Sequence, residues 1–260
     1  MKLGSLFSGI GGFELGLERA IPGLKTIWQV EQNNFCQKVL RKHWPEAKIH
    51  DDVKNITAQN VEPIDILCGG FPCQDISIAG KKRGIHEGKK SSLWWEMLRI
   101  IGELEPKIVV LENVPTIISN GGSEVVGSLA SIGYDCEWRI ISAQQFGAPH
   151  LRKRWFCVTY PHRSSPRNRT EIRSELEKTP SFKHEISPWL PPVRPSGNNQ
   201  ERSYWKEISS FSPLCGMDDG IPQGLDQAKL KEKHRKESLK AFGNAIVPQC
   251  SEYIGKLIFE

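Results

Sequence analysis

Short apolar runs alternate with amphipathic stretches from the N-terminus to about residue 162. Strand-like runs occupy residues 3–7, 64–68 and 107–111, and helical spacing is clearest at residues 93–104. This alternation is typical of βαβ units, in which helices join parallel strands and cover the sheet. The run at 107–111 contains Ile-Val-Val-Leu, as expected of a strand that is buried on both faces. The sequence therefore predicts an α/β fold, with further strands at residues 25–31, 133–141 and 155–160.

The character of the sequence changes after residue 160. Residues 161–204 are rich in Pro, Ser, Arg and Asn, which predicts little regular structure, and residues 229–240 form a highly charged connector. An apolar stripe with helical spacing returns near the C-terminus. We therefore expect a catalytic and cofactor-binding domain made of residues 1–162 plus 241–260. Residues 163–240 are expected to form a small target-recognition lobe with its connector.

Composition indicates a globular protein with a sizeable core, because 38% of the 260 residues are hydrophobic and 25% are charged. No apolar stretch approaches the roughly 20 residues of a membrane span, and the N-terminus lacks the pattern of a signal peptide. The seven cysteines are scattered and form no Cys-x-x-Cys pair. This pattern predicts reduced thiols, with neither a zinc site nor a disulfide framework. We expect a cytoplasmic location.

Basic residues gather in two segments on either side of the polar insert. The formal net charge is only +5, but arginines and lysines concentrate in residues 152–173 and 229–240. Such clusters suit contacts with a nucleic-acid phosphate backbone. An ordinary solvated surface explains the same pattern, so both interpretations stay open at this point.

Cys73 lies in the hexapeptide Gly-Gly-Phe-Pro-Cys-Gln, which follows the strand-like run at residues 64–68. A nucleophilic cysteine needs a stiff turn at the carboxyl end of a strand, where ligands collect in open α/β sheets. Glycines allow close approach of a substrate to the backbone, and Pro72 fixes φ at the turn. The alternative is an inert thiol buried in the core.

A glycine-rich turn, with Phe7, Gly9 and Gly11, separates the first strand from the first helix. Such a turn lets a nucleoside lie against bare backbone at a helix N-terminus. Glu31 follows about 20 residues later, at the end of the second strand, where an acid can hold ribose hydroxyls. Asp52 stands where a third strand is expected to end, as an acceptor for an adenine amino group or as a helix cap. The alternative that Glu31 is an ordinary surface residue with no binding role also stays open.

Charged residues also follow or precede the later strands. Glu112 comes directly after the most apolar strand, and desolvation there raises a carboxyl pKa so that the group holds a proton near neutrality. Arg152 and Arg154 precede the strand at residues 155–160 and are spaced by two, which predicts that both point to one side. Paired arginines suit a site that handles an anion or a carbonyl oxygen.

These motifs together resemble the DNA (cytosine-5) methyltransferase family, in particular its short phage and prokaryotic members. The blocks come in the family order with family-like gaps, and they cover most of the chain outside residues 163–210. The Pro-Cys-Gln and Glu-Asn-Val blocks are the most specific. The matching blocks are residues 6–13, 31, 52–53, 70–74, 112–114, 152–154 and 243–245.

The resemblance implies a Rossmann-like S-adenosylmethionine-dependent methyltransferase sheet with a small irregular recognition lobe. It implies methylation of carbon 5 of cytosine in a specific DNA sequence, on a base flipped out of the duplex. Cys73 adds to carbon 6, protonated Glu112 neutralises ring nitrogen 3, and Arg154, assisted by Arg152, holds the carbonyl oxygen. S-adenosyl-L-methionine donates the methyl group, S-adenosyl-L-homocysteine is the product, and no metal is expected. The cofactor is expected to contact Phe7, Gly9, Gly11, Glu31, Asp52, Val53, Pro72 and Asn244.

The chain departs from the family pattern at three places. Ser5 stands where many members carry Asp, His150 stands where many carry Gln, and the presumed recognition insert is very short. The resemblance also implies double-stranded DNA as partner, a possible cognate restriction endonuclease and a monomer with no membrane association. A tRNA cytosine-5 methyltransferase, a non-catalytic DNA-binding homologue and a thiol hydrolase built on Cys73 are the alternatives.

Overall fold

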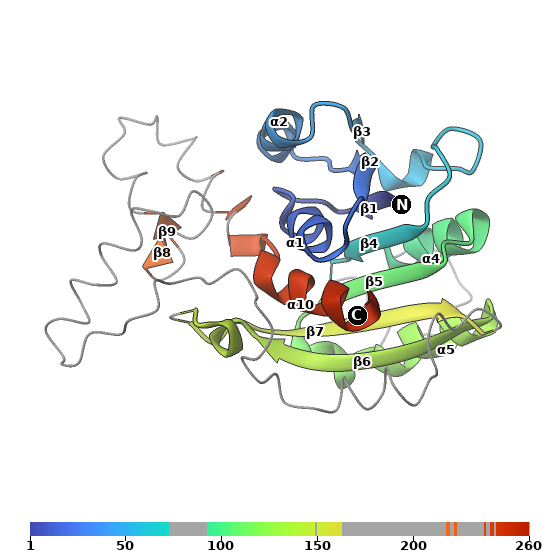
Figure 1. Cartoon of the computed structure of the whole chain (residues 1–260). Helices are drawn as coiled ribbons and strands as arrows, with labels where there is room; N and C mark the ends of the chain where they lie inside the picture. Colours follow the sequence, from blue (N-terminus) through green and yellow to red (C-terminus); the bar gives the residue numbers. More distant parts are fainter. Residues whose placement is uncertain are drawn as a thin grey trace, which may run out of the picture.

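The computed structural model describes residues 1–72, 93–148 and 150–162, the short segments 217–218 and 221–222, and residues 237, 240–241 and 243–259. Helices and strands alternate along the first part of the chain, as the sequence predicts (Figure 1). The predicted α/β fold is confirmed. Among the helices that the structure describes, none is long and apolar enough to cross a membrane.

A seven-stranded sheet with the order β3-β2-β1-β4-β5-β7-β6 forms the centre of the molecule (Figure 1). Neighbouring strands from β3 to β5 pair in parallel, whereas β7 is antiparallel to both β5 and β6. Because β7 runs against β5, the start of β7 lies at the same sheet edge as the end of β5. The strands are β1 Lys2–Leu6, β2 Lys25–Val30, β3 Lys48–His50, β4 Ile66–Gly70, β5 Ile108–Asn113, β6 Tyr134–Ser142 and β7 Lys153–Pro161.

Helices cover both faces of this sheet. Side chains of β5 alternate between the two faces of the sheet, because Ile108 and Val110 belong to one apolar cluster while Val109 and Leu111 belong to the other. Successive side chains of a strand point to opposite faces, so a fully apolar strand requires a helix layer on each side. The first layer contains α1 (Gly12–Ala20) and α10 (Pro248–Phe259), and the second contains α4 (Leu93–Leu104) and α5 (Gly122–Ser131).

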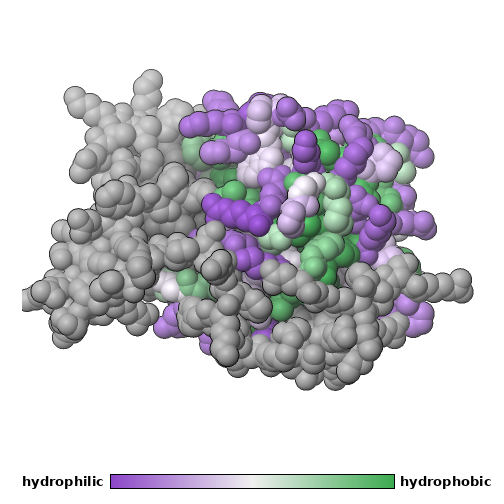
Figure 2. Space-filling view, viewed as in Figure 1, coloured by the Kyte–Doolittle hydropathy of each residue, from purple (hydrophilic) through white to green (hydrophobic). Residues whose placement is uncertain are grey.

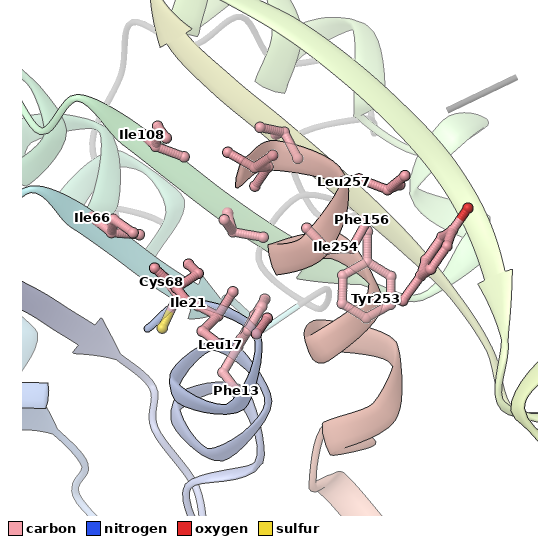
Figure 3. Close-up of a cluster of buried hydrophobic side chains, with 14 of the residues drawn as sticks. Phe13, Leu17, Ile21, Ile66, Cys68, Ile108, Phe156, Tyr253, Ile254 and Leu257 are labelled. Carbon is pink, nitrogen blue, oxygen red and sulfur yellow. The ribbon is translucent and has the colours of Figure 1, made fainter. Parts of the chain in front are cut away.

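The C-terminal helix α10 packs beside α1 on the first face of the sheet. Figure 3 shows Phe13 and Leu17 of α1 close to Ile254 and Leu257 of α10 in one apolar cluster, with Phe156 of β7 beside them. Figure 2 shows the same side of the molecule: hydrophobic residues appear mainly toward the middle of the described part, and hydrophilic residues form most of its rim. Helix α10 thus shares one apolar cluster with α1 and with the antiparallel strand β7.

The remaining elements are short and lie mostly at the sheet edges. The helix α2 (Asn34–His43) follows β2, and its N-cap Asn33 accepts from the amides of Phe35 and Cys36. The described structure also has three single-turn 3₁₀ helices and a separate two-stranded sheet: η1 (Val53–Asn55), η2 (Pro115–Ile118), η3 (Ala143–Phe146), β8 (Met217–Asp218) and β9 (Ile221–Pro222).

β4 ends at Gly70 rather than at residue 68, and β5 ends at Asn113 rather than at residue 111. Gly69 and Gly70, which were expected to follow the strand, are therefore its last two residues, and Glu112 lies within β5. Gly69 is in register with Leu6 of β1 and Leu111 of β5, and Gly70 is in register with Glu112. Pairing with neighbouring strands therefore overrides the low strand propensity of glycine.

Candidate active site

The predicted functional blocks meet at one edge of the sheet. Strands β1 to β5 are parallel, so the segments that follow them emerge on the same side, and the start of β7 joins them there. This edge is where ligands bind in open α/β folds. It carries the glycine-rich turn after β1, Glu31 after β2, Asp52 after β3, Phe71 after β4, and Arg154 at the start of β7.

The glycine-rich turn after β1 is held by Glu31. The Glu31 carboxylate accepts from the amide of Gly9 at 2.8 Å through Oε2 and from that of Asn33 at 2.7 Å through Oε1. Phe7 has φ +56°, an unusual value for a residue with a side chain, and Gly9 and Gly11 also have positive φ. Glu31 therefore holds the backbone of this turn in place from its position directly after β2. This contact argues against the alternative that Glu31 is a surface residue with no specific role.

Asp52 caps the short helix η1, which begins at Val53. Its Oδ1 accepts from the Lys54 amide at 3.0 Å, and Val53 is buried. The helix-cap alternative raised by the sequence is therefore correct. A role for Asp52 toward an adenine amino group stays a prediction.

Glu112 and Arg154 form an ion pair at the opposite end of this edge. Arg154 Nε lies 2.9 Å from Glu112 Oε1, and the Glu112 side chain is only 13% exposed. Burial raises the pKa of Glu112 from its ordinary 4.5 to about 7, although Arg154 and Arg152 act in the opposite direction. The raised pKa is the effect of desolvation that the sequence predicts, and the role of Glu112 toward a cytosine ring stays a prediction.

Gly70 and Asn113 complete the surroundings of Glu112. A Cβ placed on Gly70 would lie 2.8 Å from Glu112 Oε2, so any other residue at this position would require the carboxylate to move. Asn113 is buried, and its Nδ2 donates to the Phe71 carbonyl oxygen at 3.0 Å. Asn113 therefore ties the end of β5 to the chain that leads to Pro72 and Cys73. The sequence analysis gave Asn113 no role, and its only signal was a polar residue at the end of an apolar strand.

Arg152 and Arg154 lie next to each other but contact different groups. Arg154 is the second residue of β7, whereas Arg152 precedes the strand and has φ +27°. The Arg152 guanidinium donates to the carbonyl oxygens of Gly243 and Ala245, on either side of Asn244. Asn244 itself is exposed. The structure thus brings the predicted asparagine block to the start of β7.

A comparison with known families identifies the family of this chain. The model of the family described as C-5 cytosine-specific DNA methylase matches residues 1–210, which is more than half of the chain. The chain belongs to this family. The match includes the glycine-rich turn, Glu112 and Arg154, whereas Asn244 lies beyond it.

Curated relatives of this methylase chain are named Type II methyltransferases. M.CviJI of Paramecium bursaria Chlorella virus IL3A is 39% identical over 156 residues, which are 59% of this chain and 41% of the relative. M.HhaI of Haemophilus parahaemolyticus is 33% identical over 159 residues, 60% of this chain and 47% of the relative. M.Bsp6I of Bacillus sp. (strain RFL6) is 30% identical over 165 residues, 62% and 52%. The methylase chain spans about half the length of these relatives.

Solved structures support the fold. A putative DNA modification methyltransferase encoded within an E. coli prophage has a TM-score of 0.65 and 17% identity, covering 100% of this chain and 98% of that chain. The Dnmt2 methyltransferase of S. pombe has a TM-score of 0.65 and 16% identity, covering 99% and 98%. The expected Rossmann-like fold of an S-adenosylmethionine-dependent methyltransferase is therefore confirmed for the methylase chain.

Glu14 is a further residue of the methylase chain that the sequence analysis missed. It is fully buried in α1, where Gln29 Nε2 donates to its Oε1 at 2.9 Å. Burial raises the pKa of Glu14 above its ordinary value, and hydrogen bonds with Ser5, Gln29 and Ser8 offset this only in part. Ser8 Oγ also donates to Ser5 Oγ at 2.9 Å. Glu14 thus brings a carboxyl group beside Ser5, the position at which many family members carry Asp.

Two sets of predicted residues lie outside the part of the chain that the structure describes. Cys73 falls within residues 73–92, and the basic clusters fall largely within residues 163–216 and 223–236. The described chain reaches Pro72, which is exposed beside the buried Phe71. The role of Cys73 and the predicted division into a main domain and a lobe therefore stay predictions.

Proposed function

We propose that this chain methylates carbon 5 of cytosine within a specific DNA sequence, with S-adenosyl-L-methionine as the methyl donor. Membership of the C-5 cytosine-specific DNA methylase family supports both the reaction and DNA as the substrate. The Type II names of the curated relatives support a cognate restriction endonuclease as a functional partner. We further propose that the protein acts as a monomer on double-stranded DNA.

The observation that carries this proposal is the buried Glu112 beside Arg154. Carbon 5 of cytosine is a weak nucleophile until the ring gains electron density. A protonated Glu112, with its pKa raised to about 7, donates a hydrogen bond to ring nitrogen 3 and neutralises charge as it develops there. This stabilisation acts mainly in the transition state, so it accelerates the chemical step.

In the proposed reaction the Cys73 thiolate adds to carbon 6 of a base that has been flipped out of the duplex. The electron pair gained by the ring lets carbon 5 form a bond to the methyl group while the bond from that group to the sulfonium sulfur breaks, which leaves S-adenosyl-L-homocysteine. Loss of the carbon 5 proton then breaks the bond between Cys73 and carbon 6 and restores the aromatic ring. Arg154 holds the carbonyl oxygen at carbon 2, and Arg152 adds positive charge beside it.

The described residues at the other end of the edge suit S-adenosyl-L-methionine, which supplies a methyl group on a positively charged sulfur. A Cβ placed on Gly9 would meet nothing within 4 Å, so the turn faces open space. The carboxylates of Glu31 and Asp52 are acceptors suited to ribose hydroxyls and to an adenine amino group. Phe7, Gly11, Val53, Pro72 and Asn244 are the remaining proposed cofactor contacts.

Methyl transfer from radiolabelled S-adenosyl-L-methionine tests this function. We expect label in duplex DNA and none in tRNA, and no label in DNA with the Cys73→Ser variant, which retains DNA binding. Bisulfite sequencing of DNA from a host that expresses the protein then identifies the methylated sequence. Label in tRNA alone would favour the tRNA alternative, and DNA binding without transfer to any DNA would favour a non-catalytic homologue.

A further inference from the structure

Arg152 joins two parts of the chain that are distant in sequence. Its Nη2 donates to the carbonyl oxygens of Gly243, at 2.9 Å, and Ala245, at 2.5 Å. Hydrogen bonds from a charged guanidinium are stronger than those between neutral groups. Arg152 also has φ +27°, which is unfavourable for a residue with a side chain. The backbone thus departs from its preferred geometry at the residue that makes this contact.

The charges around Arg152 explain why its guanidinium needs the carbonyl oxygens of Gly243 and Ala245 as partners. The Glu112 carboxylate is paired with Arg154, at 2.9 Å. Burial and the positive charge of Arg154 both lower the pKa of Arg152. The carbonyl oxygens of Gly243 and Ala245 supply the negative dipole ends that hold the Arg152 guanidinium in this position.

The segment that Arg152 holds also contacts the cofactor side of the site. A Cβ placed on Gly12, at the start of α1, would lie 2.1 Å from the Ile246 carbonyl oxygen. A Cβ on Gly70 would lie 3.5 Å from Ile246 Cδ1. Ser251 Oγ, one turn into α10, donates to the Gly12 carbonyl oxygen at 3.1 Å. Residues 243–251 therefore lie between the helix that follows the glycine-rich turn and the strand ends that carry Glu112.

We propose that Arg152 is a positioning residue that couples the two halves of the site. By fastening residues 243–245 to the start of β7, it fixes Asn244 on the cofactor side relative to Glu112 and Arg154 on the base side. This inference rests on the proposed function, which assigns those residues to the methyl donor and the cytosine. Arg152 acts through the backbone that it holds, so its loss weakens cofactor binding even when no DNA is present.

The test compares Arg152→Gln and Arg152→Lys with the wild-type protein and with Arg41→Gln, an exposed arginine on α2 that serves as the matched control. Calorimetry measures binding of S-adenosyl-L-homocysteine, and hydrogen exchange measures protection of residues 243–251. Two charge-assisted hydrogen bonds are lost in Arg152→Gln, so we expect affinity to fall about tenfold or more and exchange in this segment to accelerate. Lys retains the charge but is one bond shorter, so Arg152→Lys is expected to lose about threefold, whereas Arg41→Gln matches wild type.

Kinetics give a readout that general destabilisation does not move. In Arg152→Gln we expect the KM for S-adenosyl-L-methionine to rise by a larger factor than kcat falls, with part of the loss restored in Arg152→Lys. Wild-type affinity and wild-type exchange in Arg152→Gln would overturn the inference. If that variant does not fold, the same wild-type result in Arg152→Lys overturns it. Failure of the wild-type protein to bind S-adenosyl-L-homocysteine would instead refute the proposed cofactor, and the exchange data alone would then decide whether Arg152 holds the segment.

Discussion

Glu112→Gln should change how the stability of the protein depends on pH. The Glu112 side chain is 13% exposed, and burial raises its pKa from 4.5 to about 7. Below pH 4.5 the carboxyl group is neutral in both the folded and the unfolded chain. Between these two values the unfolded chain ionises while the folded chain keeps its proton, so the free energy of unfolding falls as the pH rises. Above about pH 7 both states are ionised and the loss is complete.

The magnitude follows from the two pKa values. Each unit of difference corresponds to about 1.4 kcal/mol, so the full loss is about 3.5 kcal/mol, of which about 2.5 kcal/mol falls between pH 5 and pH 8. Glutamine cannot ionise and has nearly the same shape. The free energy of unfolding of the wild-type protein should therefore fall by about 2.5 kcal/mol relative to that of Glu112→Gln across this range.

Urea unfolding at several pH values, followed by tryptophan fluorescence, measures this difference. Other titrating groups are common to both proteins and cancel in the comparison. The control is Glu103→Gln, because Glu103 is an exposed partner of Arg99 on α4 and surface pairs contribute at most about 1 kcal/mol. Parallel curves for wild type and Glu112→Gln would show that Arg154 keeps Glu112 ionised throughout, which would refute its role as a neutral hydrogen-bond donor.

Three further substitutions test the architecture around the site. Gly70→Ala puts a Cβ 2.8 Å from Glu112 Oε2, so methyl transfer should slow by about tenfold or more, and a wild-type rate would show that the carboxylate position is not critical. Gly12→Ala puts a Cβ 2.1 Å from the Ile246 carbonyl oxygen, so urea unfolding should show a loss of about 1–3 kcal/mol, and unchanged stability would contradict the close packing. Glu31→Gln removes the charged acceptor of the Gly9 amide, so calorimetry should show about tenfold weaker binding of S-adenosyl-L-homocysteine, and equal binding would exclude Glu31 from the cofactor site.

Much of the site edge could be predicted because its residues follow strands that the sequence identifies. Glu112 comes directly after a fully apolar run. Glu31 follows the second strand at the spacing expected of an acid that binds the ribose hydroxyls of a nucleotide. Parallel pairing then brings such segments to one edge without further information. The order of strand and polar residue along the sequence was therefore sufficient to predict that Glu112 and Glu31 lie at this edge.

Other features depend on contacts that the local sequence does not contain. The partners of Arg152 lie 91 and 93 residues away, so its contact with Gly243 and Ala245 had no signal in its neighbourhood. Glu14 is an acid in the first turn of α1, where a charge is common, and its buried contact with Gln29 of β2 has no signal in the local sequence. Gly70 was expected to follow the strand because glycine has a low strand propensity, whereas its pairing with Glu112 of β5 keeps it in β4.

Covalent trapping on DNA tests the central claim most directly. Duplex oligonucleotides that contain 5-fluorocytosine in all sequence contexts, supplied with S-adenosyl-L-methionine, block the final step because fluorine replaces the proton that must leave carbon 5. We predict a denaturant-resistant protein–DNA adduct whose attachment maps to Cys73 by mass spectrometry and which is absent with Cys73→Ser. A folded, cofactor-binding wild-type protein that forms no adduct in any context, or that forms one at another residue, would contradict the account.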